Sequence, residues 1–323
     1  MSAAVADRPL PGAKVAVQPF FLAGSLYAVL MMAFWVPWFL GFIQAPSAWP
    51  AQAWFLHELA FGFAPVIVAG ALLTASAGDT SRKPVSGAIL VPIFLLWIAG
   101  RIGMGLSAHL DPWTMAALSV AFPIVLAVLA ARVLPASGRW RGLAIVALLL
   151  GLGAADALFH YEMFEFGRTK SAADVALAFA LLLLMIIAGR VVSSPKRRPT
   201  IFYAACGFVV LGAVLTALGV LWDDYDFASA GLNAWTVGSI GTLALAIATW
   251  ASRARRSPTA FGTIVLYVLA VISGLAATAG GLYPQWTLPL LPISGIAWIA
   301  AFAGFAVLYG RSVSAGSSAD SSS

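Results

Sequence analysis

Long apolar runs follow one another along almost the whole chain, and short polar or charged stretches separate them. A helix that crosses a bilayer needs about 20 apolar residues, because in lipid its backbone groups must be satisfied within the segment. The pattern therefore predicts an all-α, polytopic membrane helix bundle of about ten transmembrane helices. Their approximate ranges are 19–43, 54–76, 85–106, 112–133, 139–160, 171–193, 200–222, 229–251, 260–281 and 286–310.

The two ends of the chain are more polar than the runs between them. Residues 1–18 are expected to form a cytoplasmic N-terminal segment. The first apolar run lacks a small-residue cleavage site, which favours a retained helix over a signal peptide. The transmembrane bundle is predicted over 19–310, and the serine-rich stretch 311–323 is predicted to be a disordered cytoplasmic tail.

Positive charges give the predicted bundle an orientation, because cytoplasmic loops of membrane proteins carry an excess of lysine and arginine. If residue 1 is cytoplasmic, each of the 18 lysines and arginines except Arg101, Arg168 and Lys170 falls on the cytoplasmic side. A missed or extra helix would reverse every later loop and remove this asymmetry. We therefore expect both termini to be cytoplasmic and the number of helices to be even.

Composition excludes several classes of protein. Of the 323 residues, 62% are hydrophobic and 9% are charged, whereas soluble domains carry roughly 25% charged residues. The net charge of +6 does not indicate nucleic-acid binding, because the basic residues lie between apolar runs and form no stripe with stacking aromatics. The single cysteine, Cys206, excludes an internal disulfide. No nucleophile–base pair or phosphate loop is visible, which favours a protein without catalytic activity over an enzyme.

Ionisable residues within the predicted helices mark the candidate site. Such residues are costly in a bilayer, so they need partners or a water-filled pocket. The predicted topology places Glu58, Arg101 and Asp156 towards the outer face, at the level of His57 and His160. Asp156 and His160 are four residues apart on one predicted helix and share a face. A carboxylate that accepts the ring N–H is how proteins orient a metal-binding imidazole.

Simpler interpretations of these residues stay open at this point. His57 and His160 could form a hydrogen-bonded interfacial pair, and Arg101 with Glu58 could be a buried structural ion pair. His109 is interpreted as an ordinary interfacial residue.

A group of acidic residues and a group of methionines also lie on the predicted outer side of the bundle. The acidic stretch 223–226 is interpreted as a solvated loop, with a metal-binding carboxylate cluster as the alternative. Met104, Met115 and Met163 also fall on this side, where thioethers together with imidazoles would suit copper. Methionine is ordinary packing material in apolar helices, which favours the structural interpretation.

Several stretches, in order along the chain, resemble the NnrS family. The most specific is W-F-L-H-E-L-A-F-G-F at residues 54–63, for which the family typically reads W-H-x-H-E-M-x-F-G-F. Weaker matches in the family's order lie at residues 19–30, 69–75, 97–101, 158–160, 189–191 and 236–241.

The resemblance implies a multi-pass protein of the bacterial inner membrane that contains haem and copper and belongs to the response to nitric oxide and nitrosative stress. His57 and His160 match two of the family's histidines, which implies haem b with these two residues as axial or metal ligands. Asp156, Glu58 and Arg101 would then surround the ligands. One axial imidazole leaves iron open to a diatomic ligand such as nitric oxide, whereas two close it.

The chain departs from the family pattern in places where the family carries histidine. Phe55 stands at the first histidine of the W-H-x-H-E block, and Asn233 stands at a histidine of a later family motif. Residues 253–256 correspond to a third motif with histidine and contain no histidine. The chain is also shorter by about two helices. These losses count against a second metal site, copper in particular. The alternatives are a transporter or permease, or an accessory subunit of a respiratory complex without bound metal; no inverted sequence repeat supports a transporter.

Overall fold

The computed structural model describes residues 18–77, 85, 87–134, 139–192, 200–253 and 260–310. Within these ranges the regular elements are helical and no strand occurs. Ten segments are long and apolar enough to cross a membrane, which confirms the predicted multi-pass bundle. The N-terminal segment up to residue 17, the tail from residue 311 and most of the basic loops, which carried the orientation argument, lie outside the described residues.

The helices follow one another closely along the chain. The first half contains α1 (Gln18–Phe39), α2 (Ala51–His57), η2 (Glu58–Phe63), α3 (Ala64–Ala77), α4 (Gly87–Gly105), η3 (Ser107–His109), α5 (Pro112–Val133) and α6 (Arg139–Phe166). The second half contains α7 (Ala172–Val192), α8 (Thr200–Trp222), α9 (Tyr225–Asn233), η4 (Ala234–Ile240), α10 (Gly241–Arg253), α11 (Ala260–Leu282), η5 (Pro284–Trp286) and α12 (Thr287–Gly310).

Two predicted helix ends move enough to matter for the site. The second membrane span begins at Ala51, so His57 lies almost two turns inside it and not at its start. Helix α6 continues to Phe166, so His160 also lies within a helix and not at its end. Both histidines are therefore deeper in the bundle than the apolar pattern indicates.

Two continuous spans, α2–η2–α3 and α9–η4–α10, form the centre of the bundle. In their most apolar stretches 94% and 83% of the residues are buried, against 28–50% in the other eight spans. Each central span contains a π-helical segment, η2 or η4, in which the turns are wider than in an α-helix. Such segments are rare and frequently occur at functional sites.

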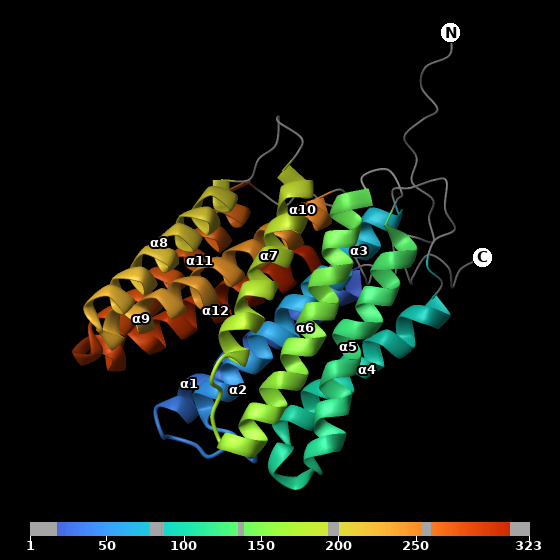
Figure 1. Cartoon of the computed structure of the whole chain (residues 1–323). Helices are drawn as coiled ribbons and strands as arrows, with labels where there is room; N and C mark the ends of the chain where they lie inside the picture. Colours follow the sequence, from blue (N-terminus) through green and yellow to red (C-terminus); the bar gives the residue numbers. More distant parts are fainter. Residues whose placement is uncertain are drawn as a thin grey trace.

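The outer helices form two flanks around the central spans. Figure 1 shows α4, α5 and α6 on one flank and α8, α11 and α12 on the other, with α7 between them. A Cβ atom on Gly310 would lie 3.3 Å from Leu22. The start of α1 and the end of α12 therefore meet on one side of the bundle, as an even number of crossings requires.

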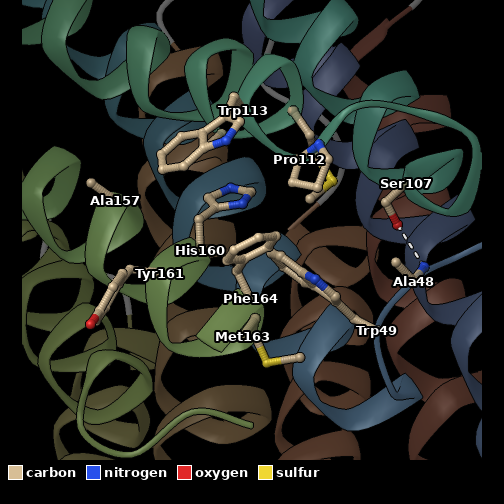
Figure 2. A pocket seen from close by; sticks show the side chains of 12 residues that line it. Ala48, Trp49, Ser107, Pro112, Trp113, Ala157, His160, Tyr161, Met163 and Phe164 are labelled. Atoms are coloured by element: carbon tan, nitrogen blue, oxygen red, sulfur yellow. Dashed lines mark hydrogen bonds between the residues drawn. The ribbon is translucent and has the colours of Figure 1, made fainter. Parts of the chain in front are cut away.

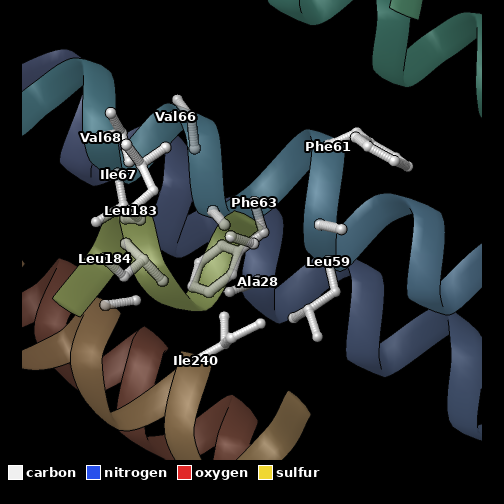
Figure 3. Packing of buried hydrophobic residues seen from close by; sticks show 14 of the residues in the cluster. Ala28, Leu59, Phe61, Phe63, Val66, Ile67, Val68, Leu183, Leu184 and Ile240 are labelled. Atoms are coloured by element: carbon white, nitrogen blue, oxygen red, sulfur yellow. The ribbon is translucent and has the colours of Figure 1, made fainter. Parts of the chain in front are cut away.

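Aromatic and aliphatic side chains fill the space between the central spans. Figure 3 shows Phe63 of η2, Leu184 of α7 and Ile240 of η4 within this core. The ring of Phe63 lies 5.8 Å from Trp298 and 5.4 Å from Phe302 of α12. Because lipid tails are as apolar as these side chains, close packing rather than water exclusion stabilises such contacts.

Small residues allow the closest helix contacts, and one of them gives a test of the packing. A Cβ atom on Gly274 of α11 would lie 2.6 Å from the Phe208 ring and 2.7 Å from Gly238 of η4, whereas one on Gly207 meets nothing within 4 Å. We expect Gly274→Ala to lower the unfolding free energy by about 1–3 kcal/mol through overpacking. The measurement is thermal unfolding in detergent. Gly207→Ala is the matched control and should be neutral or slightly stabilising; equal melting temperatures for both variants would contradict the packing.

Candidate metal centre

The five ionisable residues predicted from the sequence meet in one buried cluster. His57 ends α2 and Glu58 begins η2, Arg101 comes from α4, and Asp156 and His160 come from α6. His57, Glu58 and Asp156 are fully buried, while Arg101 and His160 are 8% and 6% exposed. The structure therefore brings together every residue that the sequence predicted for the site.

Asp156 lies at the centre of the cluster. One carboxylate oxygen, Oδ1, is 3.0 Å from Nε2 of His57 and 3.4 Å from Nε2 of His160. The other oxygen, Oδ2, accepts a hydrogen bond of 2.7 Å from the hydroxyl of Ser119 on α5. The spacing of four residues correctly predicted the Asp156–His160 contact. Ser119 was missed, because a serine in an apolar helix carries no signal of its own.

Glu58 holds the other side of His57. Its Oε1 atom accepts a hydrogen bond of 2.7 Å from Nη1 of Arg101 and lies 3.1 Å from Nδ1 of His57. The hydroxyl of Tyr27 on α1 donates to Oε2. The Arg101–Glu58 pair, considered from sequence as a structural ion pair, is present and also contacts a candidate ligand. A buried carboxylate is tolerated when a cation and hydrogen-bond donors compensate it in this way.

The π-helical segment η2 makes room for Arg101. A Cβ atom on Gly62 would collide with Nη1 of Arg101, so glycine at this position leaves the guanidinium where it reaches Glu58, and a larger residue would require it to shift. The carbonyl oxygen of Gly62 accepts a hydrogen bond of 2.9 Å from Nε1 of Trp97. The glycine of the F-G-F motif thus has a direct packing role in the site.

His57, Asp156 and His160 form a set of metal-ligand atoms. One such atom from each residue lies within 4.8 Å of the others, and no other group of three or more His, Cys, Asp or Glu does so in the described part of the chain. Metal–ligand distances of about 2.0–2.2 Å place neighbouring ligand atoms about 3–3.5 Å apart, close to the spacings around Asp156 Oδ1. Nε2 of His160 is buried and has no hydrogen-bond partner among the described residues. The atom is available to a metal ion.

A haem between His57 and His160 does not fit this arrangement. The two imidazole centroids are 5.2 Å apart and the ring planes cross at 82°, while a carboxylate oxygen of Asp156 lies close to both Nε2 atoms. The rings of Phe61 and Phe159 lie 4.9 and 5.3 Å from His57. A porphyrin would need the volume that these side chains fill, whereas a single ion would not.

A cavity of about 300 Å³ lies beside His160. Figure 2 shows His160 facing this space together with Trp49 and Trp113, and Met115 and Met163 also line it. The Trp49 ring lies 4.9 Å from His160 and 5.1 Å from His57, so it covers both imidazoles. No lysine, arginine, aspartate or glutamate is among the lining residues, and the cavity therefore suits a small uncharged molecule.

Three further acidic residues on the predicted outer side of the bundle, Asp111, Asp224 and Glu162, bind backbone N–H groups next to helix starts. Asp111 and Asp224 accept backbone N–H hydrogen bonds at the starts of α5 and α9, as N-cap residues do. Glu162 accepts the backbone N–H of Lys170 at 2.6 Å, just before α7. The acidic stretch 223–226 is therefore a helix start and not a carboxylate cluster for a metal. His109 is exposed in η3 and is not part of the His57–Asp156–His160 group.

Phe55 and Asn233, which stand where the family pattern has histidine, lie outside this cluster. Phe55 stacks on Trp35, with ring centroids 4.2 Å apart, and Nδ2 of Asn233 donates to the carbonyl oxygen of Ala277 at 3.0 Å. Both residues line a second cavity, of about 350 Å³. The two positions at which the resemblance places further histidines thus line the second cavity, whereas His57 and His160 belong to the cluster with Asp156.

Comparison with known proteins gives one match. A family model described as NnrS protein matches residues 13–200 and 194–315, which together make up most of the chain. No curated protein and no solved structure matches it. The matched region contains all residues of the cluster.

Removing Arg101 tests the buried charge network. Arg101→Met leaves Glu58 without its cation, and breaking a buried pair in this way costs about 3–5 kcal/mol. We expect a marked drop in melting temperature in detergent. The double variant Arg101→Met/Glu58→Gln should recover part of that loss, because no uncompensated carboxylate remains. If the double variant is as unstable as the single one, Arg101 acts through packing alone and the ion pair has no such role.

Proposed function

Because the chain belongs to the NnrS family, we propose that it protects cells against nitric oxide or nitrosative stress by binding nitric oxide at a metal ion held by His57, Asp156 and His160. The observation that carries the proposal is the buried set of three ligand atoms within 4.8 Å of one another. The link to nitric oxide comes from the family resemblance.

The ligand set points to a redox-active transition metal. Two imidazoles and one carboxylate with open positions are typical of non-haem iron(II) sites, and imidazole also suits copper. Nitric oxide binds to redox-active ions of this kind. We therefore propose iron or copper, with the open coordination positions available to a diatomic ligand.

The carboxylate of Asp156 supports a cation at this place. Arg101 pairs with Glu58, whereas the ion-pair contacts of Asp156 are to the two imidazoles. An imidazole that binds a metal is neutral, so a metal ion bound to Asp156 would supply the positive charge that this buried carboxylate needs. Glu58 and Ser119 meanwhile hold His57 and Asp156 in orientation, as partners of metal ligands do.

The cavity beside His160 supports an uncharged ligand. Its walls are apolar and aromatic, and no lysine or arginine lines it to attract an anion. An uncharged diatomic gas can enter such a space from the membrane or from water. Nitrite and nitrate ions would lose their hydration there without compensation.

We propose a non-haem centre in this chain, although the resemblance implies haem b. The packing around His57 and His160 leaves no room for a porphyrin between them. Phe55 and Asn233, where the family pattern has further histidines, border the other cavity. Their replacement therefore removes candidate ligands without touching the His57–Asp156–His160 cluster.

Metal analysis of the purified full-length protein tests the proposed centre. We expect about one iron or copper ion per chain, as a single three-ligand site predicts, and an absorption spectrum without a Soret band. His57→Ala, His160→Ala and Asp156→Asn should each lose the metal. His109→Ala is the matched control and should keep it. A Soret band that disappears in both His57→Ala and His160→Ala, without non-haem metal, would replace this proposal by haem.

Growth under nitric oxide tests the biological role. Cells that lack the protein should grow more slowly than the parent strain when a nitric oxide donor is present. The wild-type protein and His109→Ala should restore growth, whereas His160→Ala, produced at the same level, should not. Equal restoration by His160→Ala would separate the metal cluster from nitric oxide tolerance.

A further inference from the structure

The two central spans belong to a repeated arrangement of helices. Between residues 51 and 133 the chain forms α2, π-helical η2, α3, α4, the 3₁₀ turn η3 and α5. Between residues 225 and 310 it forms α9, π-helical η4, α10, α11, the 3₁₀ turn η5 and α12. The kinds of element and their order are the same in both stretches.

Corresponding points of the two stretches are separated by a nearly constant number of residues. The π-helical segments start at Glu58 and Ala234, 176 residues apart, and the 3₁₀ turns start at Ser107 and Pro284, 177 residues apart. The last helices end 177 residues apart, and the starts of the three pairs α2 and α9, α4 and α11, and α5 and α12 differ by 173 to 175. Unrelated helices would not keep so similar a spacing through both a π-helical and a 3₁₀-helical irregularity. Membrane proteins built from parallel repeats have this organisation.

The repeat gives the cluster residues His57, Glu58 and Arg101, which lie in the first copy, counterparts in the second copy. With the offset of the π-helical segments, the pairs are His57 and Asn233, Glu58 and Ala234, and Arg101 and Ala277. In the first copy, the Glu58–Arg101 ion pair joins the central span to α4. In the second copy, the hydrogen bond from Asn233 to Ala277 joins the corresponding central span to α11. In both copies the contact joins the central span to the helix that follows it, by an ion pair in the first copy and by an uncharged hydrogen bond in the second.

We propose that the cavity of about 350 Å³ around Asn233, which is lined by the second copy together with α1 and α2, is a separate ligand site and that it binds the uncharged headgroup of a quinone. The cavity lies at the counterpart of His57 and next to a π-helical segment, as the metal cluster does. Its size is in the range of small-molecule sites, about 300–1,000 Å³. The site is independent of the metal cluster and of its proposed function.

The lining of the cavity defines the class of ligand. Trp35, Phe39 and Phe55 provide aromatic surface for a flat ring. Gln52 and Asn233 provide amide groups; one N–H of Asn233 donates to Ala277, and its second N–H and the amide of Gln52 can donate to carbonyl oxygens of a ligand. Asp226 is the one carboxylate among the lining residues, and lysine, arginine and histidine are absent from them. A flat, uncharged ring with carbonyl oxygens matches these walls, and membrane quinones bring such a ring within the bilayer.

Binding of decylubiquinone to the full-length protein in detergent tests the site. Isothermal titration should show saturable binding. Asn233→Leu should weaken it at least about tenfold, the effect of losing about 1.4 kcal/mol, because a donor is lost at nearly constant volume. Ala276→Phe should abolish binding by filling the cavity. Ala157→Phe, placed in the cavity beside His160, is the matched control and should bind as the wild type does.

The metal content of the variants and a second set of substitutions serve as controls for this experiment. Bound metal should be unchanged in Asn233→Leu and Ala276→Phe, so failure of the metal site and failure of this site are distinguishable. If Ala276→Phe does not fold, Asn233→Leu and a change of the lining residue Ser229, Ser229→Ala, give the comparison without added bulk, and both should weaken binding. The proposal is overturned if the wild type shows no saturable binding, or if Asn233→Leu binds decylubiquinone as tightly as the wild type.

Discussion

The pairing of Glu58 with Arg101 is the constraint on which the rest of the site depends. Within a bilayer no water compensates a carboxylate, so Glu58 needs a cation and donors from other helices. Arg101 supplies the cation from α4, and Tyr27 supplies a donor from α1. Gly62 leaves the guanidinium room at the π-helical turn, where a side chain would displace it. One buried carboxylate thus fixes the relative positions of three membrane spans.

This fixed carboxylate also determines how His57 faces the metal cluster. Glu58 lies at Nδ1 of the imidazole, which leaves Nε2 directed at Asp156 on α6. Ser119 holds the other carboxylate oxygen of Asp156 from α5. The candidate metal ligands are therefore oriented by partners on membrane helices, Glu58 on the same span as His57 and Ser119 on the helix before Asp156, and their geometry does not rely on a flexible loop.

Comparison of the two copies of the repeat separates what the fold needs from what the site needs. The second copy keeps the π-helical segment and the contact between its central span and the next helix, although Asn233 and Ala277 replace His57 and Arg101. A hydrogen bond between an amide and a carbonyl is sufficient for that contact. An ion pair is therefore one of two ways of joining these helices, and in the first copy it also brings Glu58 against the candidate ligand His57.

The sequence by itself determined the ten membrane spans, because each must satisfy its backbone within about 20 apolar residues. It also identified the ionisable residues of the site, since such residues stand out in apolar helices, and it placed Asp156 and His160 on one face. Tertiary structure alone decided that His57 joins Asp156, that Ser119 supports it, and that no porphyrin fits between the histidines. It also revealed the repeat. The reason is that these helices are apolar on all sides, so the sequence pattern does not specify which faces meet or where the helical turns widen.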